Sequence, residues 1–209
     1  MSSKLAWVRK NTPIPNFEGR YYNKNCSNDW SQYIPILYKP IKYLEIGVSD
    51  GGNVIHFANS YAKHPNSEIY CVDPWMDYDG YDEYKGQQEK GWITFNKNIQ
   101  KSGSLQKFKV YRGLSEDIVP TFENDFFDII FVDGNHETEY VYKDGVMALE
   151  KVKKGGYIIF DDYCFNKYRA CIGWEQTAKG IDMFLEDYKN DIEIMVKSTS
   201  FYQVIIRKL

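Results

Sequence analysis

Short apolar runs alternate along this chain with longer segments in which apolar residues recur at helical spacing. The apolar runs predict strands at 41–47, 68–73, 107–112, 126–132 and 156–161. The segments between them predict helices at 53–64, 82–101, 114–122 and 137–153. Regular alternation of strands and helices is typical of a parallel sheet with helices on both faces. We therefore expect an α/β fold.

The end of the chain breaks this alternation. Residues 173–189 have the apolar spacing of a helix, and strands are predicted after it at 191–197 and 201–207. The three residues between these strands are too few for a parallel crossover, so the two strands must be antiparallel. We expect residues 41–209 to form one seven-stranded, Rossmann-like domain whose parallel sheet is finished by an antiparallel C-terminal strand. The irregular segment 1–40 is expected to cover the site or to form an interface.

Composition narrows the class of protein. The 209 residues are 43% hydrophobic, which suits one domain with an ample core. A net charge of -3 gives no basic surface for nucleic acid or an anionic membrane. No apolar run approaches the roughly 18 residues of a membrane span, and the first ten residues are too polar for a secretory signal. We expect a cytoplasmic protein without nucleic-acid or membrane partners; a homo-oligomer remains open.

A glycine-rich turn follows the first predicted strand. The sequence from Tyr43 to Asn53 reads YLEIGVSDGGN, so an apolar run containing Glu45 ends in Gly47 and leads into a helix. Glycine has no Cβ and therefore lets a ligand or another backbone approach closely. The turn is neither G-x-G-x-x-G nor a P-loop, which disfavours a dinucleotide or a nucleoside triphosphate. It predicts a nucleoside-like ligand, or simply a strand-to-helix connection.

Polar residues also follow the next two strands. Asp73 ends the second strand, 26 residues after Gly47, where an acidic residue can accept hydrogen bonds from both hydroxyls of a ribose. It could instead cap the turn that leads into Pro74. Ser115 and Glu116, after the third strand, could contact an adenine edge, and N-capping alone would also explain Ser115.

Three carboxylates follow the fourth and fifth strands. Asp133 ends one strand, and Asp161 and Asp162 end the other, so in a parallel sheet they would share one edge. Like charges this close raise one another's pKa unless a cation joins them, and all-oxygen ligands favour Mg²⁺, Ca²⁺ or Mn²⁺. His136, three residues after Asp133, could accept a proton near neutral pH, or it could be a packing histidine.

With these motifs the chain resembles class I S-adenosylmethionine-dependent methyltransferases from about Ile41 to Leu209. The turn from Glu45 to Gly51 is similar to the first motif of that family, and the final antiparallel strand is typical of it. The spacing of Asp133 from the Asp161–Asp162 pair, 28 and 29 positions, resembles the metal ligands of O-methyltransferases of the catechol and macrocin/sugar types. Two departures stand out: the catechol type has Asn at the position of Asp162 and a lysine base at the position of His136.

The resemblance implies a cofactor, a metal and a reaction. S-adenosylmethionine would lie with its methionine part near Glu45, Gly47, Ser49 and Asn53, its ribose on Asp73, its adenine facing Ser115 and Glu116, and its reactive end at Asp133. Asp133, Asp161 and Asp162 would bind the metal, with Mg²⁺ expected before Mn²⁺ or Ca²⁺. His136 would be the base, and the acceptor would be a hydroxyl of a small molecule or glycan, a sugar before a catechol. Aromatic residues after Asp73, among them Trp75, Tyr78, Tyr81 and Tyr84, would form a lid or a sugar-stacking wall, unless they serve ordinary packing.

Two other functions remain open on the same residues. A methyltransferase could act on nitrogen or oxygen without a metal, with the Asp pair as polar scaffold; sensitivity to chelators would separate this case. The domain could also bind a nucleoside without catalysis, as part of a glycan-assembly system. A metal group together with a base argues against the second function, because binding alone requires neither.

Overall fold

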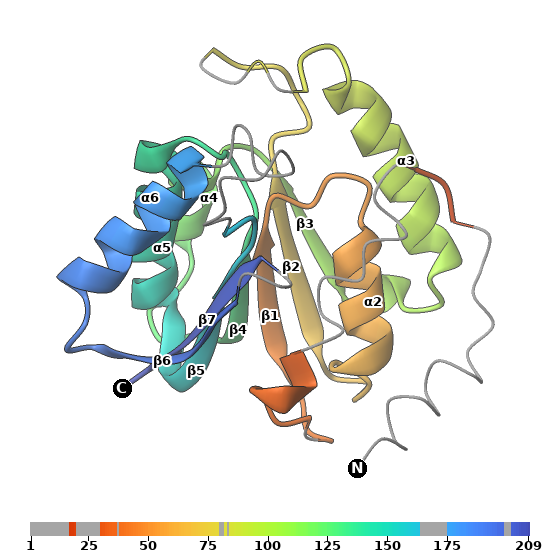
Figure 1. Ribbon diagram of the computed structural model, residues 1–209. Coiled ribbons are helices and arrows are strands. Elements are labelled where there is room, and N and C mark those ends of the chain that lie inside the picture. The colour runs from red at the N-terminus through yellow and green to blue at the C-terminus, as the bar shows by residue number, and fades with distance from the viewer. Residues whose placement is uncertain are drawn as a thin grey trace.

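The computed structural model describes residues 17–19, 30–36, 38–79, 82, 84–163, 175–198 and 202–209. Its centre is a seven-stranded sheet in the order β3-β2-β1-β4-β5-β7-β6 (Figure 1). Neighbouring strands are parallel from β3 to β5, whereas β7 is antiparallel to both β5 and β6. The predicted fold class is therefore confirmed. The strands are β1 (Lys42–Ile46), β2 (Glu68–Asp73), β3 (Phe108–Arg112), β4 (Phe127–Val132), β5 (Val152–Phe160), β6 (Ile192–Ser198) and β7 (Gln203–Lys208).

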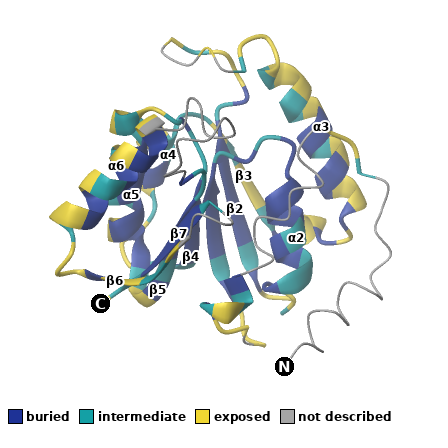
Figure 2. Ribbon diagram, viewed as in Figure 1, coloured by how far each residue is buried: buried dark blue, intermediate teal, exposed yellow. Residues whose placement is uncertain are grey.

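Helices cover both faces of this sheet. Helices α2 and α3 lie on one face, and α4, α5 and α6 lie on the other (Figure 1). Successive residues of a strand point to opposite faces, so Tyr43 joins the core under α2 while Leu44 joins the core under α5 and α6. The inner strands β1, β2, β4 and β7 are buried along most of their length, whereas the edge strands β3 and β6 are largely exposed or half-buried (Figure 2). The helices are α2 (Gly52–Ser60), α3 (Gln88–Lys101), α4 (Ser115–Ile118), α5 (Thr138–Lys151) and α6 (Glu175–Asp187), with short 3-10 turns at Leu105–Lys107 and Val119–Thr121.

Several element boundaries differ from the prediction. Helix α3 begins at Gln88 rather than at residue 82, because the backbone turns at Gly86, where φ is +76° and the N–H donates to the Asp77 carboxylate. Strand β5 follows α5 directly, so the helix predicted at 137–153 was too long and the strand predicted at 156–161 too short. The segment 114–122 is one α-helical turn followed by a 3-10 turn containing Pro120, whose ring nitrogen has no N–H to continue the helix.

Backbone hydrogen bonds hold the strand ends together at one edge of the sheet. The N–H of Gly47 donates to the Val72 carbonyl at 2.9 Å, that of Asp133 to Ile46 at 2.8 Å, and that of Asp161 to Val132 at 3.0 Å. The residues that follow β1, β2, β4 and β5 are thus brought to a common edge, which is where open α/β sheets bind ligands. Among the described helices, none is both long and apolar enough to cross a membrane.

Part of the segment before β1 belongs to the core. Trp30 is fully buried under α2, and its indole N–H donates to the side-chain oxygen of Gln203 in β7 at 2.7 Å. Glu18 and Gly19 lie at the cavity described below. Most of the segment predicted as an irregular cover lies outside the described residues, so its role as a cover or an interface remains a prediction.

Candidate active site

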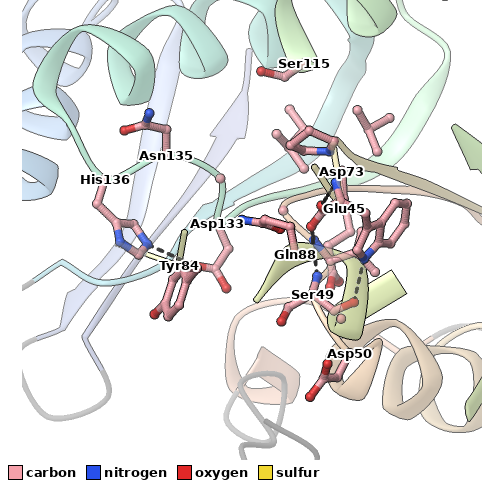
Figure 3. Close-up of a pocket in the computed structure, with 18 of the residues that line it drawn as sticks. Glu45, Ser49, Asp50, Asp73, Tyr84, Gln88, Ser115, Asp133, Asn135 and His136 are labelled. Atoms are coloured by element: carbon pink, nitrogen blue, oxygen red, sulfur yellow. Dashed lines mark hydrogen bonds and ion pairs between the residues drawn. The ribbon is translucent and has the colours of Figure 1, made fainter. Parts of the chain in front are cut away.

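A cavity of about 840 Å³ opens at the carboxyl ends of the parallel strands. Every residue predicted for the site lines it, and Figure 3 shows how several of them converge. These residues are Glu45, Gly47, Ser49, Asn53, Asp73, Ser115, Glu116, Asp133, His136, Asp161 and Asp162. These residues come from the carboxyl ends of four strands, β1, β2, β4 and β5, with the loops that follow them, and from helices α2 and α4, so only the tertiary fold brings them together. Their individual roles remain predictions.

The glycine turn lies against the end of β4. At Gly47, where φ is +82°, an added Cβ would lie 1.8 Å from the carbonyl oxygen of Asp133. Glycine is therefore required for β1 and β4 to approach at this point. Ser49, Trp75 and Asp162 have positive φ without being glycine, and all three line the cavity. Strained backbone of this kind gathers at ligand sites.

Asp73 holds the glycine turn in place. Its Oδ2 accepts the N–H groups of Val48 and Ser49 at 2.8 and 2.9 Å, and its Oδ1 accepts the N–H of Trp75 at 2.8 Å. Burial raises the pKa of Asp73, while these three hydrogen bonds act in the opposite direction. The turn-capping role considered for Asp73 is confirmed. A ribose contact would use the lone pairs that these amides leave free.

Glu45 belongs to a buried polar triad with Tyr43 and Asn53. The hydroxyl of Tyr43 donates to Oε2 of Glu45, and the amide nitrogen of Asn53 donates to the same oxygen at 2.7 Å. Burial raises the pKa of Glu45 well above its usual range, and the charges of Asp133 and Asp161 add to the effect. The amide oxygen of Asn53 is buried and has no hydrogen-bond partner. The triad therefore leaves one acceptor for a ligand that carries N–H or O–H groups.

Asp133, His136 and Asp162 form the candidate metal group. One ligand atom from each lies within 4.8 Å of the others, and Nε2 of His136 is 3.3 Å from Oδ2 of Asp162 and 3.7 Å from Oδ1 of Asp133. Asp161 is not a member of this group; its Oδ1 accepts a hydrogen bond from Gln203 at 3.0 Å. The geometry thus places His136 beside two of the predicted ligands, in a position to bind the metal as well as to act as a base.

Asp144 is a site residue that the sequence analysis missed. It is 3% exposed, lines the cavity from α5, and accepts a 2.6 Å hydrogen bond from the Ser115 hydroxyl. This contact corrects the N-cap expected of Ser115, which is the first residue of α4, while Leu114 occupies the capping position without a side-chain bond. The available signal was an acidic residue in register with the buried face of a helix, three residues after Val141 and four before Ala148.

The aromatic residues after Asp73 divide into two groups. Trp75 is fully buried against Phe95 and Trp92 and donates its indole N–H to the Ser49 carbonyl, so it has the packing role. Tyr78 and Tyr84 line the cavity. Tyr81 lies outside the described residues. Of the aromatic residues predicted to form a lid or sugar-stacking wall, the structure therefore leaves Tyr78 and Tyr84 as the candidates among the described residues.

Comparisons with known proteins agree on the class. Residues 44–163, more than half of the chain, match the family model described as a methyltransferase domain. An uncharacterized protein of Acanthamoeba polyphaga mimivirus, R132, is 31% identical over 129 residues, which are 59% of this chain and 52% of that protein. The chain thus matches about half the length of this curated relative.

Two solved structures illustrate the similarity of the fold. An O-methyltransferase of Bacillus cereus in complex with SAH is 17% identical, with a TM-score of 0.60 over 100% of this chain and 92% of that one. TomG of Streptomyces achromogenes, an O-methyltransferase of tomaymycin synthesis in complex with SAM, is 14% identical, with a TM-score of 0.61 over 98% and 94%. The family match and the seven-stranded fold agree with the resemblance found in the sequence: this chain belongs to the methyltransferase domain family.

Proposed function

We propose that this protein transfers a methyl group from S-adenosylmethionine to a hydroxyl of a small molecule, most simply a sugar, with the help of a divalent cation. The observation that supports this most is the position of the Asp133–His136–Asp162 group on the same cavity as the glycine turn. The O-methyltransferase fold of the two solved structures agrees with the proposal.

The cavity fits the cofactor in size and chemistry. Its volume of about 840 Å³ lies in the range of small-molecule sites. The side-chain oxygen of Asn53, which is buried without a hydrogen-bond partner, would accept a hydrogen bond from the α-ammonium group of the methionine part. The carboxylates of the Asp133–His136–Asp162 group would provide negative charge beside a positively charged sulfonium. The buried Glu45, whose raised pKa favours its protonated form, would offer hydrogen bonds rather than charge. Bound S-adenosylmethionine would supply an electrophilic methyl group.

The Asp133–His136–Asp162 group fits a divalent cation. Two carboxylates suit Mg²⁺, Ca²⁺ and Mn²⁺, and an imidazole nitrogen in the set shifts the expectation toward Mn²⁺ beside Mg²⁺. A cation held there would lower the pKa of an acceptor hydroxyl. In one arrangement His136 removes the hydroxyl proton; in the other it is itself a ligand, and the proton leaves by another route.

The first experiment measures methyl transfer to a panel of hexoses, deoxysugars and catechols, with Mg²⁺, with Mn²⁺ and with a chelator. We expect turnover that depends on the cation. Asp162→Ala should lower this turnover by roughly 10² while S-adenosylmethionine still binds in calorimetry, because the variant removes one oxygen ligand and alters only the metal group. Asp117→Ala, a change of an exposed residue of α4 that does not line the cavity, is the matched control.

Asp161→Ala separates the two possible ligand sets. A loss of metal affinity equal to that of Asp162→Ala would return Asp161 to the ligands, as the sequence predicted. Full activity of the wild type after chelation would exclude a metal from the mechanism and would favour a metal-independent methyltransferase. Cofactor binding without transfer to any acceptor would favour the non-catalytic function.

A further inference from the structure

Ser115 and Asp144 form a hydrogen-bonded pair in the cavity, and neither belongs to the Asp133–His136–Asp162 group. Ser115 lies at the start of α4 and Asp144 within α5, and both line the cavity. The Ser115 hydroxyl oxygen is 2.6 Å from Oδ1 of Asp144, whose side chain is almost fully buried. In Figure 3, Ser115 lies well away from Asp133 and His136. None of the chemistry proposed above uses Asp144.

The pair has a fixed hydrogen-bonding direction when Asp144 is ionised. A carboxylate can only accept hydrogen bonds, and a serine hydroxyl has one proton and two lone pairs. The single proton of Ser115 is therefore directed to Asp144, and the serine oxygen presents only lone pairs to the cavity. Toward a ligand, the two side chains then act as acceptors.

The order of the strands indicates which end of the cofactor meets this pair. The strand ends run from β3 with Ser115, through β2 with Asp73 and β1 with Glu45, to β4 with Asp133. This step rests on the proposed function: a cofactor with its methyl group beside Asp133 would extend its base toward the end of β3. The base would therefore meet Ser115.

We propose that Asp144 determines the base specificity of the cofactor site, by orienting the Ser115 hydroxyl so that it accepts from the 6-amino group of adenine and disfavours the 6-keto group of hypoxanthine. Adenine offers N–H donors at this position. Hypoxanthine offers an acceptor, which would face the serine lone pairs and leave both groups without a partner. Sites built to pair with a substrate N–H discriminate strongly against analogues that lack it, because the buried partner is then unsatisfied.

The charges around Asp144 define the conditions for a test. Burial raises the pKa of Asp144 to about 7; the Ser115 hydrogen bond opposes this shift and Glu116 of α4 adds to it. Tyr78 and Tyr140 also line this cavity, and Asp144 contributes to the raised pKa of Tyr78. Asp144 is thus mostly ionised at pH 8 and mostly protonated at pH 5.5, where its own proton can point to Ser115 and release the serine proton toward the ligand.

The experiment compares the calorimetric affinities of S-adenosylhomocysteine and S-inosylhomocysteine. For the wild type at pH 8 we expect the adenine compound to bind at least about tenfold more tightly. Asp144→Asn should reduce this ratio to about threefold or less, because an amide N–H can donate to Ser115 and free its proton for a keto oxygen. Asp117→Asn, the same change on an exposed residue of α4, should keep the wild-type ratio.

A second measurement needs no variant. For the wild type, the ratio should fall at pH 5.5 relative to pH 8. An unchanged ratio in Asp144→Asn, or equal affinities of the wild type for both compounds at pH 8, would overturn the inference while leaving the cofactor site intact. Failure of the wild type to bind S-adenosylhomocysteine at all would instead overturn the proposed function, and the inference with it.

Discussion

Gly47 shows how a single residue can determine whether the site assembles. A methyl group at this position would overlap the carbonyl oxygen of Asp133, one of the three residues of the candidate metal group. The backbone φ of +82° is also one that residues other than glycine rarely adopt. Gly155 in β5 has a similar φ of +75° but has open space around the position of a Cβ. The two glycines therefore separate steric overlap from backbone strain.

We predict that Gly47→Ala lowers the free energy of unfolding by about 3 kcal/mol, the sum of strain and overlap. Gly155→Ala should cost only the strain, about 1 kcal/mol. Urea denaturation of the two variants checks the difference. Equal losses would mean that β1 and β4 can separate at Gly47 without cost.

The role of His136 is the second question at the residue scale. If His136 removes the acceptor proton, His136→Ala should lower turnover by roughly 10² and leave the affinity for Mn²⁺ nearly unchanged. If His136 is a ligand, Mn²⁺ affinity should fall together with turnover. Steady-state kinetics combined with Mn²⁺ titration followed by electron paramagnetic resonance distinguishes the two roles, and near-normal turnover would exclude both.

At the scale of elements, the contact between α4 and α5 depends on a buried carboxyl. Asp144 has a pKa of about 7 in the folded protein and an ordinary value of 3.8. Between these values the folded state keeps a proton that the unfolded state has lost, so stability falls as the pH rises from about 4 to about 7. The loss is on the order of 4 kcal/mol, since each pKa unit is worth about 1.4 kcal/mol.

Asp144→Asn should remove this dependence. We predict that the variant gains stability relative to the wild type as the pH rises from 4 to 8, because asparagine pairs with Ser115 without a charge to bury. Thermal unfolding of both proteins at several pH values measures the difference, and other titrating groups cancel in the comparison. A constant difference across this range would show that the pKa of Asp144 is not raised by folding.

At the scale of the whole molecule, Asn98 of α3 joins segments that are distant in sequence. Its side chain accepts from the N–H of Glu18 at 2.9 Å and donates to the carbonyl oxygens of Glu18 and Asp50 at 2.7 and 2.9 Å. Glu18 and Asp50 both line the cavity. The ion pairs of Lys97 and Lys101 with Glu18 add little to the free energy of unfolding, because these side chains are largely exposed.

Asn98→Ala should therefore lower stability by about 3 kcal/mol, since buried backbone groups lose their partners. It should also weaken binding of S-adenosylmethionine, because one rim of the cavity loses its attachment. Asn96→Ala, two residues away on the same helix, removes one hydrogen bond to Trp92 from a half-buried side chain and should cost below about 1 kcal/mol. Thermal unfolding and calorimetry check both variants; equal effects would show that the attachment to Glu18 and Asp50 is unimportant.

The sequence by itself determined the order of elements and the edge at which the site lies. Period-two and helical patterns identify strands and helices, and polar residues at strand ends must gather at one edge of a parallel sheet. Asp73, Asp133 and Asp161 could therefore be assigned to one cavity without coordinates. The short connection before β7 likewise fixed the direction of that strand, because three residues cannot make a parallel crossover.

Only the tertiary structure decided which of these groups contact one another. The sequence cannot tell that Asp161 bonds to Gln203 while His136 lies beside Asp162, because those contacts join distant elements. Asp144 was hidden for the same reason, since a carboxylate within a helix acquires a function only from what the fold packs against it. Local patterns reflect the covalent neighbours of a residue, whereas a site is defined by its neighbours in space.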